Sequence, residues 1–359
     1  MYWIANPSDD PALNLALEEY LMSGLPAGHP GYAILWQNRP TIVVGRFQNA
    51  RQEINESYVR EHGITVVRRM TGGGAVYHDA GTLNYTFIHH LGQEGVLPSF
   101  RDAGKPIALA LRSLGLPVDF SGRNDLILDG SKVAGVAHCR IGARFLHHGC
   151  ILVDSDLDVL SQALRVDPEK FRSKGVASVR SRVTNLADWL EAHKPAARTG
   201  APNSNGLGVS DRTTGQRLTV ERVRQAILAH CGGEVLELGE ADWTGVRTLR
   251  DSKYATDEWV YGMSPAFTEH LKRRFPWGKV EVFYDAKKGR IASCRILGDF
   301  FVNSAAGQGI GVEEVERALT GVACVPEAIA AALETVPLEA VFSGCDPRLM
   351  RNFLAGCET

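Results

Sequence analysis

Short runs of apolar residues recur through the first half of the chain and predict β-strands. Residues 33–36, 41–44, 64–67 and 83–88 are rich in β-branched and aromatic side chains, and polar or glycine-containing segments separate them. This composition favours strands over helices. Because only a short Asn-Arg-Pro break separates 33–36 from 41–44, we expect these two strands to pair.

Helices are predicted where apolar residues recur at intervals of three and four. Asp10 is a candidate N-cap for the first helix, and Pro11 fits the first helical position, where its missing N–H costs nothing. Similar patterns cover residues 101–118, 156–164 and 219–228. We expect such helices to lie over a sheet and bury their apolar faces against it.

The chain is expected to form two domains of unequal size. Apolar periodicity lapses at residues 249–261, which predicts a linker between a large domain, residues 1–248, and a small domain, residues 262–359. Within the large domain, residues 193–217 carry mostly small and polar side chains, so we expect a flexible surface insertion there.

The small domain is predicted to combine strands with helices. Residues 280–284 and 290–301 read as a β-hairpin, and residues 313–319 and 326–334 as helices that follow it. It is therefore expected to be a small α+β unit.

Charge and apolar content indicate which classes of partner the chain binds. Lys and Arg number 39 against 41 Asp and Glu, a formal charge of -2, so neither sign dominates and we expect no nucleic-acid partner. No apolar run approaches the roughly 20 residues that span a bilayer, and early acidic residues argue against a signal peptide. We expect no membrane partner and a cytoplasmic location.

The seven cysteines form no Cys-x-x-Cys pair, which is typical of reduced thiols.

The most informative stretch is residues 68–79, RRMTGGGAVYHD, where two arginines precede three consecutive glycines. Strand-like runs on both sides place the glycines in a loop. Glycines let backbone N–H groups approach an anion closely, and an arginine adds a planar cationic fork. The stretch favours a phosphate or carboxylate site, although a tight turn between strands explains the glycines equally well.

A second stretch, residues 124–137, reads as a hairpin that turns at an Asp-Gly pair. It places Lys132 near the start of the returning strand and Gly135 where a missing side chain permits close approach of a ligand. Spacing alone favours an exposed turn lysine for Lys132. Residues 144–154 follow directly and contain the run HHGCILVD.

Together these stretches resemble the lipoate-protein ligase family. Four motifs occur in the family's order: RRxTGGGAVYHD at 68–79, GRNDL at 122–126, KVxGxA at 132–137 and HHGxxL at 147–152. The resemblance is dense from residue 33 to 190 and thin after 262. It implies an α+β fold, with a mixed β-sheet catalytic domain of biotin/lipoate ligase type flanked by helices and a small α+β C-terminal accessory domain.

The resemblance also implies a reaction. Ligases of this family activate lipoate with ATP to lipoyl-AMP and then transfer the lipoyl group to a lysine of lipoyl-domain acceptors, which are E2 subunits of 2-oxoacid dehydrogenases and the glycine cleavage H protein. Lipoate, ATP and Mg²⁺ are the implied substrates and cofactors. Lys132 is implied as the catalytic residue and Asp125 as a Mg²⁺ ligand. The other implied binding residues are Arg69, Thr71, Gly73, Gly74, Ala75, Val76, Tyr77, His78, Asn124, Ala137 and His148.

Cys150 keeps an alternative open. Related ligases usually carry Thr or Ser at this place, and a cysteine near the pocket fits an octanoyl or lipoyl transferase of the same superfamily, which passes acyl groups through a thioester without ATP. Packing of Cys150 within a strand is the simpler interpretation. Two further alternatives are weaker: a biotin ligase usually carries a GRGRxG loop in place of TGGGAV, and a non-catalytic lipoate-binding protein would be expected to lack Lys132.

Overall fold

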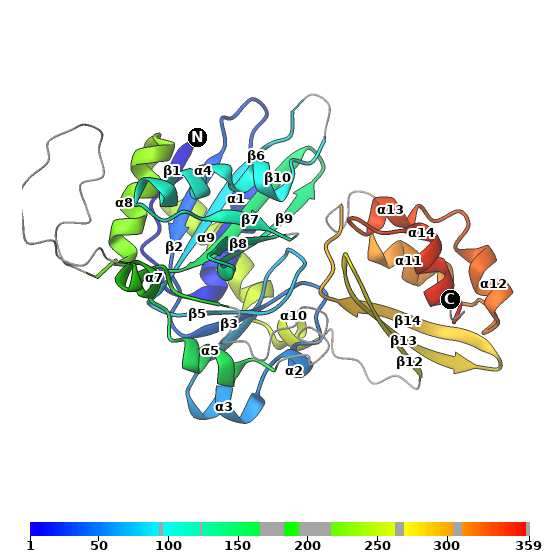
Figure 1. Ribbon diagram of the computed structural model, residues 1–359. Helices are drawn as coiled ribbons and strands as arrows, with labels where there is room; N and C mark the ends of the chain where they lie inside the picture. The colour runs from blue at the N-terminus through cyan, green and yellow to red at the C-terminus, as the bar shows by residue number, and fades with distance from the viewer. Residues whose placement is uncertain are drawn as a thin grey trace, which may run out of the picture.

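The chain folds into a large N-terminal domain and a small C-terminal domain (Figure 1). The computed structural model describes residues 1–92, 96–122, 124–165, 183–193, 217–262, 269–303 and 311–356. The expected insertion at 193–217 lies almost entirely outside the described residues. Within the described part of the chain, no helix is both long and apolar enough to cross a bilayer.

A mixed β-sheet forms the centre of the large domain. Its strands, in spatial order along the described chain, are β11 (Glu234–Leu236), β1 (Tyr2–Ile4), β2 (Tyr32–Trp36), β6 (Thr82–His90), β10 (Arg144–Leu152), β9 (Ser131–Ile141), β8 (Asp125–Leu128) and β7 (Asp119–Ser121). β1 runs parallel to β11 and β2, and the remaining neighbours are antiparallel. The predicted mixed sheet is confirmed.

Helices cover both faces of this sheet. One face carries α4 (Phe100–Ser113), α7 (Leu186–Ala192) and α8 (Val220–Cys231). The other face carries α1 (Pro11–Gly24) and α9 (Glu240–Leu249). Asp10 caps α1 as predicted, because its carboxylate accepts hydrogen bonds from the N–H groups of Ala12 and Leu13.

A second sheet carries the glycine loop. Its strands are ordered β4 (Thr65–Arg68), β3 (Thr41–Val44) and β5 (Val76–His78), and the loop joins β4 to β5. Around it pack α2 (Ala50–Glu53), α3 (Glu56–Glu61), α5 (Leu157–Ala163) and α10 (Asp257–Tyr261). The predicted position of the glycines, between strands, is confirmed.

The predicted pairing of residues 33–36 with 41–44 is wrong. The first run belongs to β2, which pairs with β1 and β6, whereas the second is β3, which pairs with β4 and β5 in the other sheet. The chain passes between the sheets at Asn38, whose buried side chain hydrogen-bonds to Asn14 and His78. Strands joined by a short break can pair or diverge, and tertiary contacts of this kind decide which.

Residues 249–261, the expected linker, are helical and packed on the large domain. They comprise the end of α9, the π-helical turn η1 (Arg250–Tyr254) and α10. Tyr254 is fully buried and donates a hydrogen bond to Glu19 of α1, and Arg68 of β4 donates to the main-chain carbonyl of Val260. The apolar pattern lapses because these hydrogen bonds, rather than a continuous apolar face, anchor the segment.

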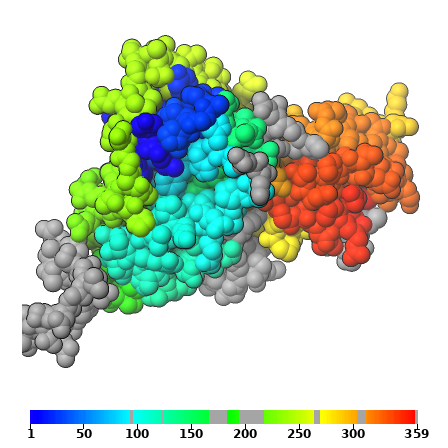
Figure 2. Space-filling view, turned by 90° about the horizontal axis from the view of Figure 1, so that it is seen from above, coloured from blue at the N-terminus to red at the C-terminus, as the bar shows by residue number. Residues whose placement is uncertain are grey.

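The small domain is built on an antiparallel sheet, and in Figure 2 it forms a lobe beside the large domain. Its strands are β12 (Glu269–Phe275), β13 (Gly278–Lys287) and β14 (Arg290–Gly298). Its helices in the described chain are α11 (Val312–Leu319), α12 (Pro326–Ala332), α13 (Leu338–Val341) and α14 (Pro347–Leu354). The predicted hairpin and first two helices are confirmed as β13, β14, α11 and α12; β12, α13 and α14 were not predicted.

The two domains meet beside the glycine loop. The Gly73 N–H donates to the Phe300 carbonyl, with 3.2 Å between nitrogen and oxygen. Lys279 of β13 and Glu53 of α2 form an ion pair across the same boundary, with 3.3 Å between Nζ and Oε1. The small domain therefore closes one side of the space in front of the loop.

Candidate active site

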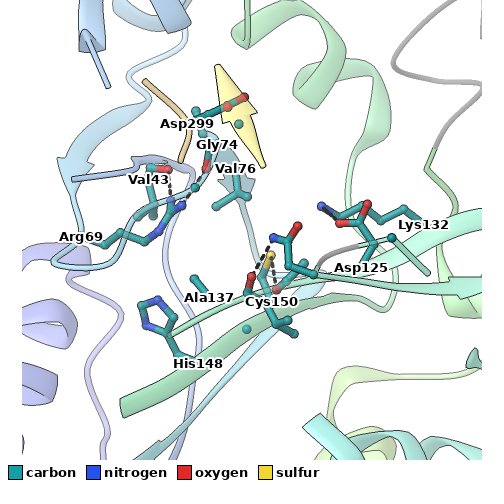
Figure 3. A pocket seen from close by; sticks show the side chains of 18 of the residues that line it. Val43, Arg69, Gly74, Val76, Asp125, Lys132, Ala137, His148, Cys150 and Asp299 are labelled. Atoms are coloured by element: carbon teal, nitrogen blue, oxygen red, sulfur yellow. Dashed lines mark hydrogen bonds and ion pairs between the residues drawn. The ribbon is translucent and has the colours of Figure 1, made fainter. Parts of the chain in front are cut away.

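A cavity of about 710 Å³ lies between the large sheet, the glycine loop and the small domain. Arg69 and Lys132 both line it, so the two cations that the sequence singles out share one space (Figure 3). The other predicted binding residues on its wall are Gly73, Gly74, Ala75, Val76, His78, Asn124, Asp125, Ala137 and His148. Tyr77 instead packs in the apolar cluster between β5 and α5, and Thr71 is buried behind the wall.

Gly45, just after β3, lets the glycine loop lie close to that strand. A Cβ atom on Gly45 would overlap the Gly73 carbonyl oxygen. Gly73 has a φ of 92°, a left-handed value that residues with side chains rarely adopt. The loop therefore has a conformation that only glycine permits at these two positions.

Arg69 organises the loop through its guanidinium group. Nε donates to the Thr71 hydroxyl (2.9 Å), Nη1 to the Val43 carbonyl (3.1 Å), and Nη2 to the carbonyls of Gly72 (2.7 Å) and Gly74 (2.8 Å). These bonds use four of the five N–H donors of an arginine. Burial lowers the pKa of Arg69 to about 10, which leaves the side chain charged at neutral pH. Arg69 thus adds charge to the wall while most of its donors stabilise the loop.

Arg68 does not join Arg69 in an anion site. Its side chain is fully buried and donates to the main-chain carbonyls of Gly45 (2.8 Å), Gln48 (2.7 Å) and Val260 (2.6 Å). These bonds tie α10 to the turn after β3. Of the two adjacent arginines, only Arg69 lines the cavity.

A buried chain of hydrogen bonds supports Arg69 from behind. His148 Nδ1 donates to the Glu18 carboxylate (2.9 Å), and His148 Nε2 accepts from the Thr71 hydroxyl (2.8 Å), which itself accepts from Arg69. The Thr86 hydroxyl also donates to Glu18. Glu18 is completely buried in α1. Glu18 was not predicted as a site residue, because a glutamate in an amphipathic helix gives no sign of a buried partner on a distant strand.

We expect Glu18→Gln to reduce the free energy of unfolding by about 1–3 kcal/mol. Glu18 Oε1 accepts from both Thr86 and His148, and Oε2 lies 3.1 Å from His148 Nδ1. The amide NH2 of glutamine cannot accept, so in either orientation it faces the His148 N–H donor. Chemical denaturation measures the change. Glu61→Gln, at an exposed position on α3, is the matched control and should change stability by less than about 0.5 kcal/mol. Equal effects of the two substitutions would contradict the proposed chain.

Lys132 stands beside the turn of the β8–β9 hairpin. Asp129 and Gly130 have φ values of 48° and 80°, the two left-handed values that a tight hairpin turn requires, so the predicted turn is confirmed. The Lys132 amine lies 2.8 Å from Asp125 Oδ1 on β8. Gly135 gives this amine room above the sheet, since a Cβ atom there would lie 2.8 Å from Nζ.

The floor of the cavity is a row of cross-strand neighbours in the large sheet. Gly135 of β9 pairs with Cys150 of β10, Cys150 pairs with Asn84 of β6, and Asn84 pairs with Trp36 of β2. Directly paired residues lie on the same face of a sheet, and all four line the cavity. The floor therefore extends from the Lys132 amine at one end to the Trp36 indole at the other.

Cys150 lies in the middle of this floor as a protonated thiol. Burial raises its pKa, and its sulfur contacts the Gly135 carbonyl oxygen at 3.9 Å. A cysteine nucleophile reacts as the thiolate, which a lowered pKa favours. Burial of Cys150 instead raises the pKa of its thiol and so disfavours the thiolate.

Two buried donors that the large domain contributes to the cavity wall have no acceptor among the described residues. They are Asn84 Nδ2 and His78 Nε2. Leaving a buried donor unpaired costs about 1–3 kcal/mol. Both groups therefore mark places where a ligand atom that accepts a hydrogen bond would be stabilised.

The described residues include no group of three or more His, Cys, Asp or Glu side chains that could hold a metal ion. Asp125 contributes one carboxylate, which is ion-paired with Lys132. Mg²⁺ is commonly bound by one or two carboxylates together with water and phosphate oxygens. Asp125 therefore fits a cation that arrives with a nucleotide, and not a metal site formed by protein ligands alone.

The small domain adds Arg274, Phe275 and Asp299 to the cavity wall. None of them was predicted from the sequence, because the contact between two domains leaves no local pattern in either. Apolar residues of the large domain were also missed as wall residues, among them Leu15 of α1 and Trp36 of β2.

Comparison with known proteins finds two family models along the chain. Residues 10–200 match the lipoyl protein ligase A/B catalytic domain, and residues 264–354 match the bacterial lipoate protein ligase C-terminus. Among curated relatives, the lipoate-protein ligase LplJ of Bacillus subtilis is 36% identical, with 95% of this chain and 96% of the relative covered. A lipoate–protein ligase of Staphylococcus aureus is also 36% identical, with 89% and 90% covered.

Solved structures show the same architecture. Plasmodium falciparum LipL1 in complex with lipoate has a TM-score of 0.75 at 20% identity, and the match covers 99% of both chains. A lipoate protein ligase of Thermoplasma acidophilum, described as bipartite and solved with its E2 lipoyl domain, has a TM-score of 0.58 at 26% identity and matches 75% of this chain. The similarity to LipL1 extends over both domains, and it concerns the fold alone.

Proposed function

Because the chain belongs to the lipoate-protein ligase family, we propose that it activates lipoate with ATP and attaches the lipoyl group to a lysine of lipoyl-domain acceptor proteins. The acceptors in this proposal are E2 subunits of 2-oxoacid dehydrogenases and the glycine cleavage H protein. The proposal also includes Mg²⁺ as cofactor, no nucleic-acid or membrane partner, and a cytoplasmic location. Free cysteines in the described chain support a reducing compartment.

One observation carries the proposal: the Lys132 amine, the glycine loop and a largely apolar floor enclose the same cavity. A site for lipoate and ATP needs all three features side by side. The floor suits an apolar chain, the amine suits a carboxylate next to a phosphate, and the loop suits phosphate oxygens.

In the proposed first step, a lipoate carboxylate oxygen attacks the α-phosphorus of ATP, and pyrophosphate leaves. Two anions must approach each other, so fixed positive charge and oriented N–H groups are needed to offset their repulsion. Lys132 contacts both reacting groups, and the backbone N–H groups of residues 74–76 bind phosphate oxygens in the loop that Arg69 stabilises. The Gly73 N–H is already bonded to the Phe300 carbonyl. Asn124 and Asp125 would lie beside the nucleotide, where the Asp125 carboxylate would hold Mg²⁺ together with phosphate oxygens.

In the proposed second step, the acceptor lysine amine attacks the lipoyl carbonyl carbon, and AMP leaves. The mixed anhydride is already activated, so the enzyme mainly positions the acceptor lysine. No covalent enzyme intermediate is needed.

Cys150→Ser is expected to retain adenylation within about threefold of the unmodified enzyme, because a buried protonated thiol takes no part in the ligase reaction. Lipoate-dependent exchange of pyrophosphate into ATP measures this. The transferase alternative makes the opposite prediction: no exchange, and loss of acyl transfer in Cys150→Ser.

The proposed function is tested by incubating the full chain with lipoate, ATP, Mg²⁺ and an isolated lipoyl domain. Mass spectrometry of the lipoyl domain should show one added lipoyl group, and omission of ATP should abolish it. Modification that persists without ATP would contradict the ligase function.

A further inference from the structure

Two residues that line the cavity, from different sheets, carry unpaired donors. Asn84 lies on β6 of the large sheet and His78 on β5 of the small one, and they are 1% and 3% exposed. Neither Asn84 Nδ2 nor His78 Nε2 has a hydrogen-bond acceptor among the described residues. Since both residues line the cavity, a bound ligand can supply the acceptor.

The surrounding hydrogen bonds make His78 a donor at Nε2. Asn14 Nδ2 donates to the Gln37 carbonyl and to Asn38 Oδ1, which fixes the orientation of the Asn38 amide. Asn38 Nδ2 then donates to His78 Nδ1 at 3.1 Å, so Nδ1 is the acceptor and Nε2 carries the proton. Burial lowers the pKa of His78 to about 3, which keeps the ring neutral with a single N–H at Nε2.

The sheet register places these donors at a set distance from Lys132. The Lys132 amine lies over Gly135 of β9, and Asn84 lies on β6, two strands away along the floor. The backbones of these two strands are about 9.5 Å apart. Trp36 is the next residue in the row, and its ring lies 6.1 Å from the His78 ring, centroid to centroid. The two donors therefore lie at the end of the floor away from the amine.

An eight-carbon acid fits this span. An extended chain advances roughly 1.2 Å per bond, so seven bonds cover about 8 Å. With its carboxylate at Lys132, such an acid brings its far end to Asn84 and His78. In lipoate that end is a dithiolane ring, whose two sulfur atoms are weak acceptors; in octanoate it is a methyl group, which accepts nothing.

We propose that the Asn84 amide and the His78 Nε2–H donate hydrogen bonds to the dithiolane sulfurs and so select lipoate over acids of equal length that lack sulfur. The proposal rests on the proposed function of the same cavity. Buried donors discriminate strongly against a substrate that leaves them unpaired. This discrimination is larger than that of an apolar site between substrates that differ by one methylene. Asn84 and His78 therefore select a substrate by the hydrogen-bond acceptors in its ring and not by the shape of the ring.

The test compares lipoate with ω-cyclopentylpentanoate, which keeps the ring and chain but replaces both sulfurs by carbon. In pyrophosphate exchange by the full enzyme, kcat/KM should be about threefold to tenfold higher for lipoate. Asn84→Leu should lower this ratio to the part that the His78 donor supplies, mainly by raising KM for lipoate. Asn84→Ala, which removes the amide without adding bulk, should do the same.

Leu15→Met is the matched control, because it alters the same cavity without changing a donor, and it should keep the ratio of the unmodified enzyme. Equal kcat/KM for the two acids in the unmodified enzyme would overturn the inference, as would a ratio that neither Asn84 substitution lowers. Exchange with neither acid would instead contradict the proposed function itself.

Discussion

Lys132→Ala is expected to slow formation of the lipoyl adenylate by at least about a hundredfold while the protein stays folded. The amine is the cation best placed to contact both a carboxylate at the cavity floor and a phosphate at the glycine loop. Its side chain is 22% exposed and pairs with Asp125, which is 15% exposed. Because this pair is partly solvated, its loss should cost little stability. Pyrophosphate exchange measures the rate, and circular dichroism measures the fold.

Lys105→Ala is the matched control for Lys132. Lys105 is exposed on α4, outside the residues that line the cavity. It should leave exchange unchanged within about twofold. Exchange by Lys132→Ala at a rate close to that of Lys105→Ala would remove Lys132 from the mechanism.

The second large effect concerns stability. Arg68→Met is expected to reduce the free energy of unfolding by at least about 3 kcal/mol, because main-chain carbonyls at Gly45, Gln48 and Val260 would lose their buried donor. Burial lowers the pKa of Arg68 to about 10, so the group still carries its charge and all its protons at neutral pH. The methionine side chain is unbranched and partly fills the space of the arginine, but it cannot donate any of these hydrogen bonds.

Arg60→Met separates this effect from a general loss of positive charge. Arg60 is exposed on α3, and its replacement should change the free energy of unfolding by less than about 0.5 kcal/mol. Urea denaturation of both variants gives the comparison. If Arg68→Met unfolds at the same urea concentration as Arg60→Met, the carbonyl contacts do not anchor α10.

Features with a strong local signal could be predicted from the sequence. The Asp-Gly turn before Lys132 needs two left-handed residues, and few other dipeptides supply them. Asp10 followed by Pro11 marks a helix start because each residue satisfies a requirement of the first turn. The glycine loop followed from strand-like runs on either side of residues that carry no side chain.

Features that depend on distant contacts could not be predicted. The adjacent residues Arg68 and Arg69 have the same chemistry, yet one binds carbonyls of α10 and the other the glycine loop, since successive residues at a strand end point in different directions. Glu18 and Asn84 matter only because α1, β6 and β10 pack together. The contribution of Arg274 to the cavity depends on how two domains meet.

A crystal structure of the full chain with a non-reactive analogue of lipoyl-AMP tests the central claim most directly. We expect the phosphate-mimicking group within hydrogen-bonding distance of both Lys132 Nζ and the N–H groups of residues 74–76, with the acyl chain along the floor from Gly135 towards Asn84. An analogue bound with that group away from Lys132, or outside this cavity, would contradict the central claim.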